Sequence, residues 1–117
     1  MEIKYTVLVL AHMGIQSPKQ GYHYLVEIIH LAVNSDTPFY KLKDLYQMTA
    51  DSFRTTPLCV ETNVKSFLKE FWHDSEKIKQ FETFTGYEMD EALTPKEFIF
   101  LVADFIRCHD FPSYFGF

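Results

Sequence analysis

The hydrophobic and polar positions between residues 45 and 72 follow a helical period on both sides of a short polar turn. The apolar positions of the second half share one face of a helical wheel: Val60, Val64, Phe67, Leu68 and Phe71. Opposite them lie Leu58, Thr62, Lys65, Ser66 and Lys69. This pattern predicts an amphipathic helix whose apolar face is buried in a core.

The turn itself is predicted at Arg54, Thr55 and Thr56. The Thr56 hydroxyl can cap a helix by accepting from a backbone N–H of its first turn, and Pro57 fits the first helical position, where no N–H is needed. A short helix, a turn of this length and a second helix with one buried face is the outline of a helix-turn-helix. Taken alone, the outline more often belongs to a helix pair that serves only packing.

The rest of the chain also reads as helices. Proline follows Ser or Thr at four helix starts, and Thr94 with Glu97 forms a capping box. Helices are expected at residues 3–13, 18–34, 38–43, 45–53, 57–72, 75–84 and 95–109, with Gly86 as a stop. Residues 5–10 contain enough β-branched residues to suit a strand, but we expect a helix. No repeat or linker interrupts the pattern, which predicts one all-α domain over residues 1–117.

Composition narrows the functional classes. The 117 residues are 47% hydrophobic, yet no apolar run is long enough to span a membrane. Two cysteines, Cys59 and Cys108, are too few for a disulfide framework and suit a reducing compartment, so we expect a cytoplasmic protein. The net charge of −5 opposes simple DNA binding. However, residues 41–73 carry five basic and four acidic residues, whereas residues 74–91 carry two lysines and six acids, so the acidity lies downstream of the turn.

Metal and catalytic chemistry find little support in the sequence. Glu27 and His30 have the spacing of a di-iron ligand pair, with His23 on the same face, but such a site needs the motif twice. Cys108 and His109 lack a second pair, and Cys59 lacks the partners of a nucleophile. No phosphate-binding glycine loop or nucleophile elbow is present. We therefore expect neither an enzyme nor a metal or other cofactor.

Four segments together resemble a known family. They are GYHYLVEIIH at residues 21–30, the stretch at residues 45–72, FETFTGYEM at residues 81–89 and TPKEFIFLVADFIR at residues 94–107. In order and near-constant spacing, they resemble the C-terminal DNA-binding domain of the sporulation initiation transcription factor of spore-forming Firmicutes. The resemblance implies a compact bundle of about six helices containing a helix-turn-helix, whose second helix enters the DNA major groove, often as tandem dimers. Family members normally follow a phosphorylated receiver domain, for which this sequence holds no counterpart.

The resemblance also implies a set of DNA-binding residues. The candidates near phosphates are Arg54, Thr55 and Thr56, and those along the second helix are Leu58, Cys59, Glu61, Thr62, Lys65, Ser66 and Lys69. Where the family usually has Ser-Arg-Val-Glu-Arg-x-x-Arg-His, this chain has Leu-Cys-Val-Glu-Thr-Asn-Val-Lys-Ser at residues 58–66, so three arginines are missing. Lysine cannot reproduce the bidentate contact of arginine to guanine. Two interpretations stay open: a stand-alone regulator with altered or weakened DNA specificity, or an interaction module that dimerises with itself or a relative and no longer reads DNA.

The end of the chain carries an aromatic sequence, DFPSYFGF, from Asp110. Its aromatic side chains are Phe111, Tyr114, Phe115 and Phe117. Packing against the domain's own core is the expected arrangement, and presentation to a partner is the alternative.

Overall fold

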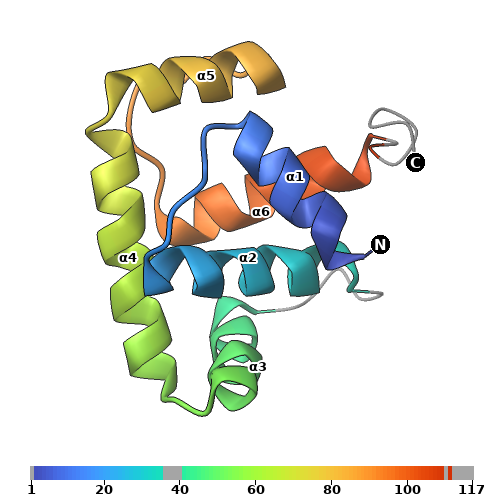
Figure 1. Ribbon diagram of the computed structural model, residues 1–117, viewed down its shortest axis with the longest axis vertical. Coiled ribbons are helices and arrows are strands. Elements are labelled where there is room, and N and C mark those ends of the chain that lie inside the picture. The colour runs from blue at the N-terminus through green and yellow to red at the C-terminus, as the bar shows by residue number, and fades with distance from the viewer. Residues whose placement is uncertain (1, 36–40, 110, 112–117) are drawn as a thin grey trace.

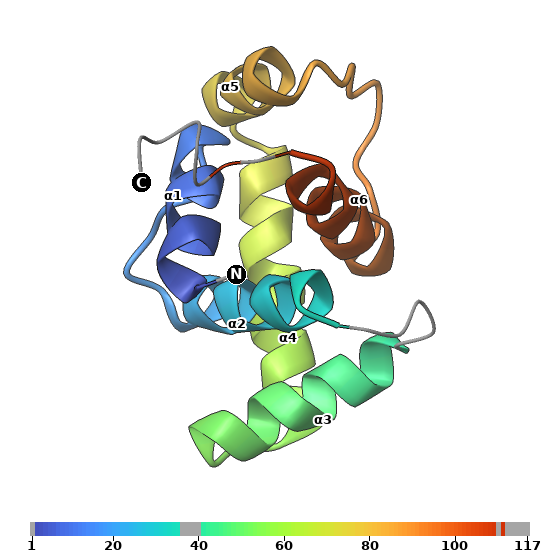
Figure 2. The same cartoon turned by 90° about the vertical axis from the view of Figure 1, so that its right-hand side faces the viewer.

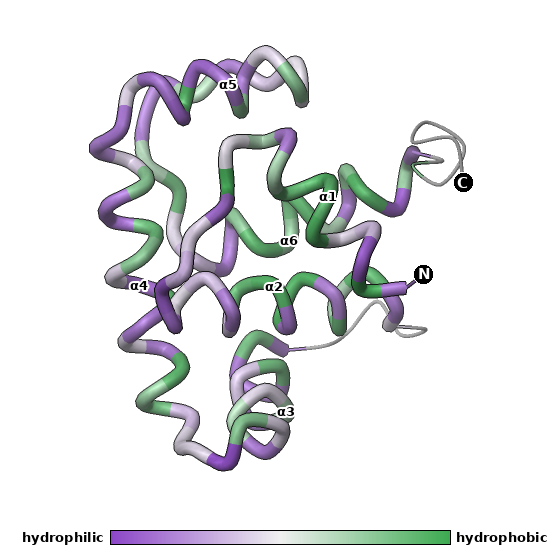
Figure 3. The backbone as a smooth tube through the Cα atoms, in the orientation of Figure 1, coloured by the Kyte–Doolittle hydropathy of each residue, from purple (hydrophilic) through white to green (hydrophobic). Residues whose placement is uncertain are grey.

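A largely apolar sequence makes α2 (Gln20–Val33) the centre of the fold. Leu25, Ile28 and Ile29 have no exposed surface, and α2 contacts α1, α3, α4 and α6. Figure 1 shows α2 crossing the middle of the molecule, and Figure 3 shows how its hydrophobic residues contrast with the alternating pattern of α4. The computed structural model describes residues 2–35, 41–109 and 111.

Within the described residues, six helices and no strands make up the regular structure. They are α1 (Ile3–His12), α2 (Gln20–Val33), α3 (Leu42–Phe53), α4 (Pro57–Trp72), α5 (Ser75–Thr85) and α6 (Pro95–Arg107). Figures 1 and 2 agree that α3 lies at one end of the molecule and α5 at the other, with α4 running between them. None of these helices has the length and apolar character that crossing a bilayer requires. The all-α prediction is confirmed.

Most helix boundaries follow the local signals in the sequence. Helix α4 spans the predicted residues, and Gly86 ends α5 in the left-handed conformation with φ 80°. At the start of α6, the Glu97 amide donates to Thr94 Oγ1 (3.2 Å) and the Thr94 amide donates to Glu97 Oε1 (2.9 Å). The predicted capping box is therefore present. The ambiguous residues 5–10 are helical, as expected.

Three boundaries differ from the predictions by two residues or more, and the ends of α1, α2 and α5 differ by one residue. Residues 42–53 form one helix and not two, because no glycine or proline separates the segments predicted at 38–43 and 45–53; the start expected at Pro38 lies outside the described residues. Helix α2 begins at Gln20, because the Ser17 hydroxyl accepts from the Lys19 amide (3.1 Å) in a bend that delays the helix. Helix α6 ends at Arg107, two residues early.

The core joins the apolar faces of all six helices. Every residue predicted to be buried is buried: Val60, Val64, Phe67, Leu68, Phe71, Phe98, Val102 and Phe105. Phe71, Phe81 and Phe98 form a three-ring cluster, with centroids 5.8–6.1 Å apart, that joins α4, α5 and α6. Phe111 is also buried, against Phe84 and Phe105. The rest of the predicted aromatic tail, with Tyr114, Phe115 and Phe117, lies outside the described residues.

Candidate nucleic-acid interface

The turn between α3 and α4 has a well-defined backbone. Arg54 adopts the left-handed conformation (φ 55°, ψ 48°) and is the one described non-glycine residue with positive φ. The Thr55 amide donates to the Ala50 carbonyl (2.9 Å) and the Arg54 amide donates to the Asp51 carbonyl (3.4 Å). This is the hydrogen-bond pattern of a Schellman motif, in which glycine is the usual residue at the Arg54 position. An exposed arginine is thus held where it is conformationally unfavourable.

Helix α4 begins at the residue that the sequence predicts. Thr56 Oγ1 accepts from the Cys59 amide (3.1 Å), and Pro57 occupies the first helical position. The first turn contains no acidic side chain. These features fix where α4 starts and which way its N-terminal turn points.

One face of α4 stays uncovered along most of its length. Its members are Leu58, Thr62, Lys65, Ser66 and Lys69, which we call the exposed face of α4. Leu58 is 70% exposed, compared with 44% for Ile3 and 39% for Phe53, the other exposed large apolar side chains described. Five of the predicted site residues therefore lie together on a surface that no other described element covers.

Cys59 does not belong to this surface. It is half-buried, and its Sγ lies 3.9 Å from the Tyr24 hydroxyl of α2 and 3.6 Å from Asn63 Nδ2. The structure thus places the candidate Cys59 on the flank of α4 that packs against α2. The reason is the close approach of α2: a Cβ at Gly21 would lie 2.4 Å from the Asn63 carbonyl oxygen and 2.9 Å from Phe67 Cβ, so the two helices touch along this flank.

Glu61 lies on the other flank of α4 and engages one of the candidate base readers. Its carboxylate is 2.7 Å from Lys65 Nζ, one turn further along the helix. Glu61 also faces the phenol of Tyr46 in α3, and burial together with this carboxylate raises the pKa of Tyr46 to about 12. The predicted site therefore contains a cation that is already paired within the helix.

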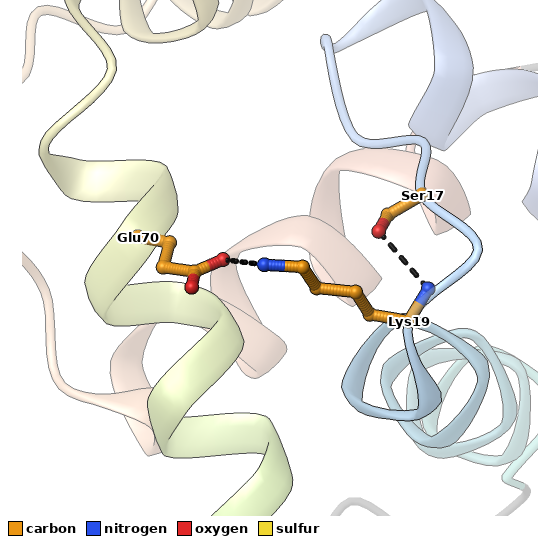
Figure 4. A network of polar contacts seen from close by, with 3 residues as sticks. All are labelled: Ser17, Lys19 and Glu70. Carbon is orange, nitrogen blue, oxygen red and sulfur yellow. Dashed lines mark hydrogen bonds and ion pairs between the residues drawn. The ribbon is translucent and has the colours of Figure 1, made fainter.

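An ion pair that sequence reasoning missed joins α4 to the residue that precedes α2. Lys19 Nζ lies 2.5 Å from Glu70 Oε2, and Figure 4 shows the Lys19 side chain extending from the bend at Ser17 toward Glu70 on α4. The two residues are 51 positions apart, and both side chains are more than half exposed. No local sequence signal links them. The pair sets a basic group beside the exposed face of α4 and neutralises it there.

The histidines considered as metal ligands serve other contacts. His30 is half-buried beside Thr6 Oγ1 (3.5 Å), and burial lowers the pKa of its imidazole, whereas His23 is exposed. Across residues 2–35, 41–109 and 111, no three His, Cys, Asp or Glu side chains are grouped to hold a metal ion.

Comparison with known proteins gives one family. The family model described as "Sporulation initiation factor Spo0A C terminal" matches residues 6–106 of the chain. The match spans the described helices from α1 to α6 almost completely. No solved structure matches the chain significantly.

Proposed function

The chain belongs to the family of C-terminal domains of the sporulation initiation factor Spo0A, a family of DNA-binding effector domains and not of enzymes, and from this membership we propose that it is a sequence-specific transcriptional regulator with weakened or altered specificity. In this proposal, α3, the turn and α4 act as a helix-turn-helix. The exposed face of α4 enters the major groove, and Arg54, Thr55 and Thr56 lie near backbone phosphates.

The observation that carries the proposal is the uncovered polar face of α4. Sixteen residues give a helix of about 24 Å, and the major groove is wide enough to admit one. Thr62, Lys65, Ser66 and Lys69 offer hydroxyl and ammonium groups along this face. The turn between α3 and α4 lies at the end of the molecule (Figure 1), where a DNA backbone can approach without touching α1, α5 or α6.

The weakened specificity follows from the chemistry of the same face. A good bidentate contact between arginine and guanine contributes about 1–3 kcal/mol of discrimination. No arginine lies on the exposed face of α4, and Lys65 is paired with Glu61. Base reading by this helix therefore lacks the planar fork of arginine, and its contacts discriminate less.

The second candidate function is a protein-interaction module that dimerises with itself or a relative and has lost DNA reading. The net charge of −5 and the two ion pairs that neutralise Lys19 and Lys65 favour it. The two functions differ in one measurable respect, since only the first requires α4 to sit in the groove.

The test restores arginines on the exposed face. The double variant Thr62→Arg, Lys65→Arg leaves the packed residue Cys59 untouched and should raise the ratio of affinities for a family-type box and a scrambled duplex by at least about tenfold. Fluorescence anisotropy at fixed salt measures both affinities. Thr83→Arg, which adds the same single charge on α5, is the matched control and should leave the ratio unchanged. An equal gain on both duplexes in the double variant would mean that α4 is not in the groove.

Salt dependence separates the two functions in the unmodified protein. With three or four phosphates neutralised, the slope of log K against log salt should be about −3 to −4. A slope near −8 would reveal a larger basic surface than this proposal uses. No binding to any duplex at low salt would leave the interaction module as the function.

A further inference from the structure

A pocket of about 360 Å³ lies beside the exposed face of α4, between its C-terminal half and the segment that leads into α6. Its lining residues are Lys65, Leu68, Lys69, Trp72, His73, Ala92, Leu93 and Pro95. The walls are mainly apolar, and the charged members lie on the α4 side. Neither the family match nor the DNA-binding proposal gives this pocket a role.

The lining has an unusual charge balance for this protein. Lys65, Lys69 and His73 are basic and no lining residue carries a carboxylate, although the Glu61 carboxylate pairs with Lys65 from outside the lining and the whole chain has a net charge of −5. A smaller cavity on the opposite flank of α4, about 170 Å³, is lined in part by Glu70 and Asp74. The larger pocket thus combines apolar walls with a positive rim, which fits an apolar side chain carried between negative groups.

We propose that this pocket binds an acidic peptide segment of a partner protein, in which one large apolar side chain enters between Leu68, Trp72 and Leu93 and its flanking Asp or Glu carboxylates pair with Lys65 and Lys69. The proposal rests on the DNA-binding function in one respect only, the competition described below. A few anchor side chains that are well packed and desolvated in a pocket supply most of the affinity of an interface.

Two other occupants fit the pocket less well. A DNA phosphate would meet the basic rim, but it is strongly hydrated and gains nothing from Leu68, Ala92 and Leu93. A second copy of this chain could offer the acidic residues Glu88, Asp90 and Glu91, which are exposed next to the pocket. Both occupants give results in the experiment that differ from those of a peptide.

Occupation of the pocket would control DNA binding directly. Lys65 and Lys69 line the pocket and also belong to the exposed face of α4. A peptide that pairs with Lys69 and competes with Glu61 for Lys65 occupies the cations that DNA needs, and linkage requires DNA to expel the peptide by the same factor. The partner would therefore act as an inhibitor by mutual exclusion.

The experiment uses the one tryptophan of the chain, which lines the pocket as Trp72. A short synthetic peptide with a central leucine between glutamates is titrated against the full chain while Trp72 emission is followed. A saturable change is expected. Replacing the leucine by alanine, or the glutamates by lysines, should each weaken binding by at least about fivefold, since each removes one of the two features that the pocket matches.

Two variants of the protein test the location. Leu93→Ser removes an apolar wall and Ala92→Glu places a carboxylate at the mouth of the pocket. Each variant should lower the affinity for the peptide by at least about fivefold. Ile3→Ser makes the same apolar-to-hydroxyl change on an exposed residue of α1 and should have no effect. Ala92 is exposed outside any helix, so its substitution tests the site even if the Leu93 variant folds poorly.

The remaining outcomes are decisive in either direction. No change in Trp72 emission, or equal binding of the lysine-containing peptide, overturns the proposal. If the Trp72 signal depends on protein concentration without peptide, and sedimentation shows a dimer, the pocket is assigned to a second copy and the proposal is overturned.

The same peptide also tests the competition with DNA. Peptide that displaces a labelled duplex supports mutual exclusion. If the chain binds no duplex, the DNA-binding function fails, while the Trp72 titration still decides the occupant of the pocket.

Discussion

The two faces of α4 are under different physical constraints. One face, with Val60, Val64 and Phe67, is buried against α2, α3 and α6, and each of its side chains has neighbours on every side. The other face is the exposed face of α4 defined above, and it contacts solvent. A change on the buried face alters the packing of four helices, whereas a change on the exposed face alters only what the helix can bind. The fold can therefore persist while the family's arginines are lost.

The starts of α4 and α6 show the same contrast in smaller form. Both begin with Thr-Pro, and both threonine hydroxyls accept from the amide three residues on. In α6 that residue is Glu97, whose carboxylate returns the hydrogen bond by accepting from the Thr94 amide, whereas the corresponding residue of α4 is Cys59, which has no carboxylate to do so. The start of α6 therefore has two reciprocal capping hydrogen bonds, whereas the start of α4 has only the one to the Thr56 hydroxyl.

The largest effect is expected from Phe67→Ala on the buried face of α4. Truncation of a buried aromatic leaves a cavity and should lower the free energy of unfolding by about 3–5 kcal/mol. Leu58→Ala on the exposed face is the matched change and should shift it by less than about 0.5 kcal/mol. Urea unfolding measures both. Similar losses in the two variants would break the distinction between the faces.

Gly21→Ala tests the flank where α2 meets α4. The added methyl would lie 2.4 Å from the Asn63 carbonyl oxygen, so the helices must separate, and we expect a loss of about 1–3 kcal/mol despite the better helix propensity of alanine. His23→Ala, exposed two residues along α2, is the control. Unfolding free energies that match in the two variants would show that the close approach is not needed.

Arg54→Gly addresses the turn, where stability and binding are expected to oppose each other. Glycine adopts the left-handed conformation without strain, so the variant should gain about 1 kcal/mol of stability. If Arg54 contacts a phosphate, the salt slope of DNA binding should become less negative by about 1. Arg54→Ala removes the same charge but retains the strain, so it should lose the contact without gaining stability. A glycine variant that is more stable and binds DNA unchanged would remove Arg54 from the interface.

The smallest effect concerns the capping carboxylate of α6. The hydrogen bond from the Thr94 amide holds the pKa of Glu97 below its usual value. A lowered pKa in the folded state means that the stabilisation is present above the pKa of the unfolded chain and is lost as the pH falls through the folded value. Glu97→Gln keeps an acceptor at this position but does not titrate. The melting temperatures of the two proteins should therefore differ at neutral pH and converge in acid; a constant gap would contradict the assignment.

Much of the fold could be predicted from local signals. The Thr-Pro pairs at residues 56–57 and 94–95, the glycine at residue 86 and the wheel through Val60 and Phe71 fix helix limits and buried faces by interactions within a few residues. The prediction was wrong at residues 41–45, where two segments form one helix. The candidate site was predicted as a set of residues, and its DNA-binding role stays a prediction.

What the sequence by itself determined is where the helices form and which face of each is apolar, because capping, backbone conformation and periodicity act over one or two turns. Only the tertiary structure decided that Cys59 packs against Tyr24, that Gly21 lets α2 touch α4, and that Lys19 reaches Glu70. These contacts join residues between 35 and 51 positions apart or depend on a missing side chain. Their geometry follows from how whole helices cross, and no local pattern records the angle or the distance of a crossing.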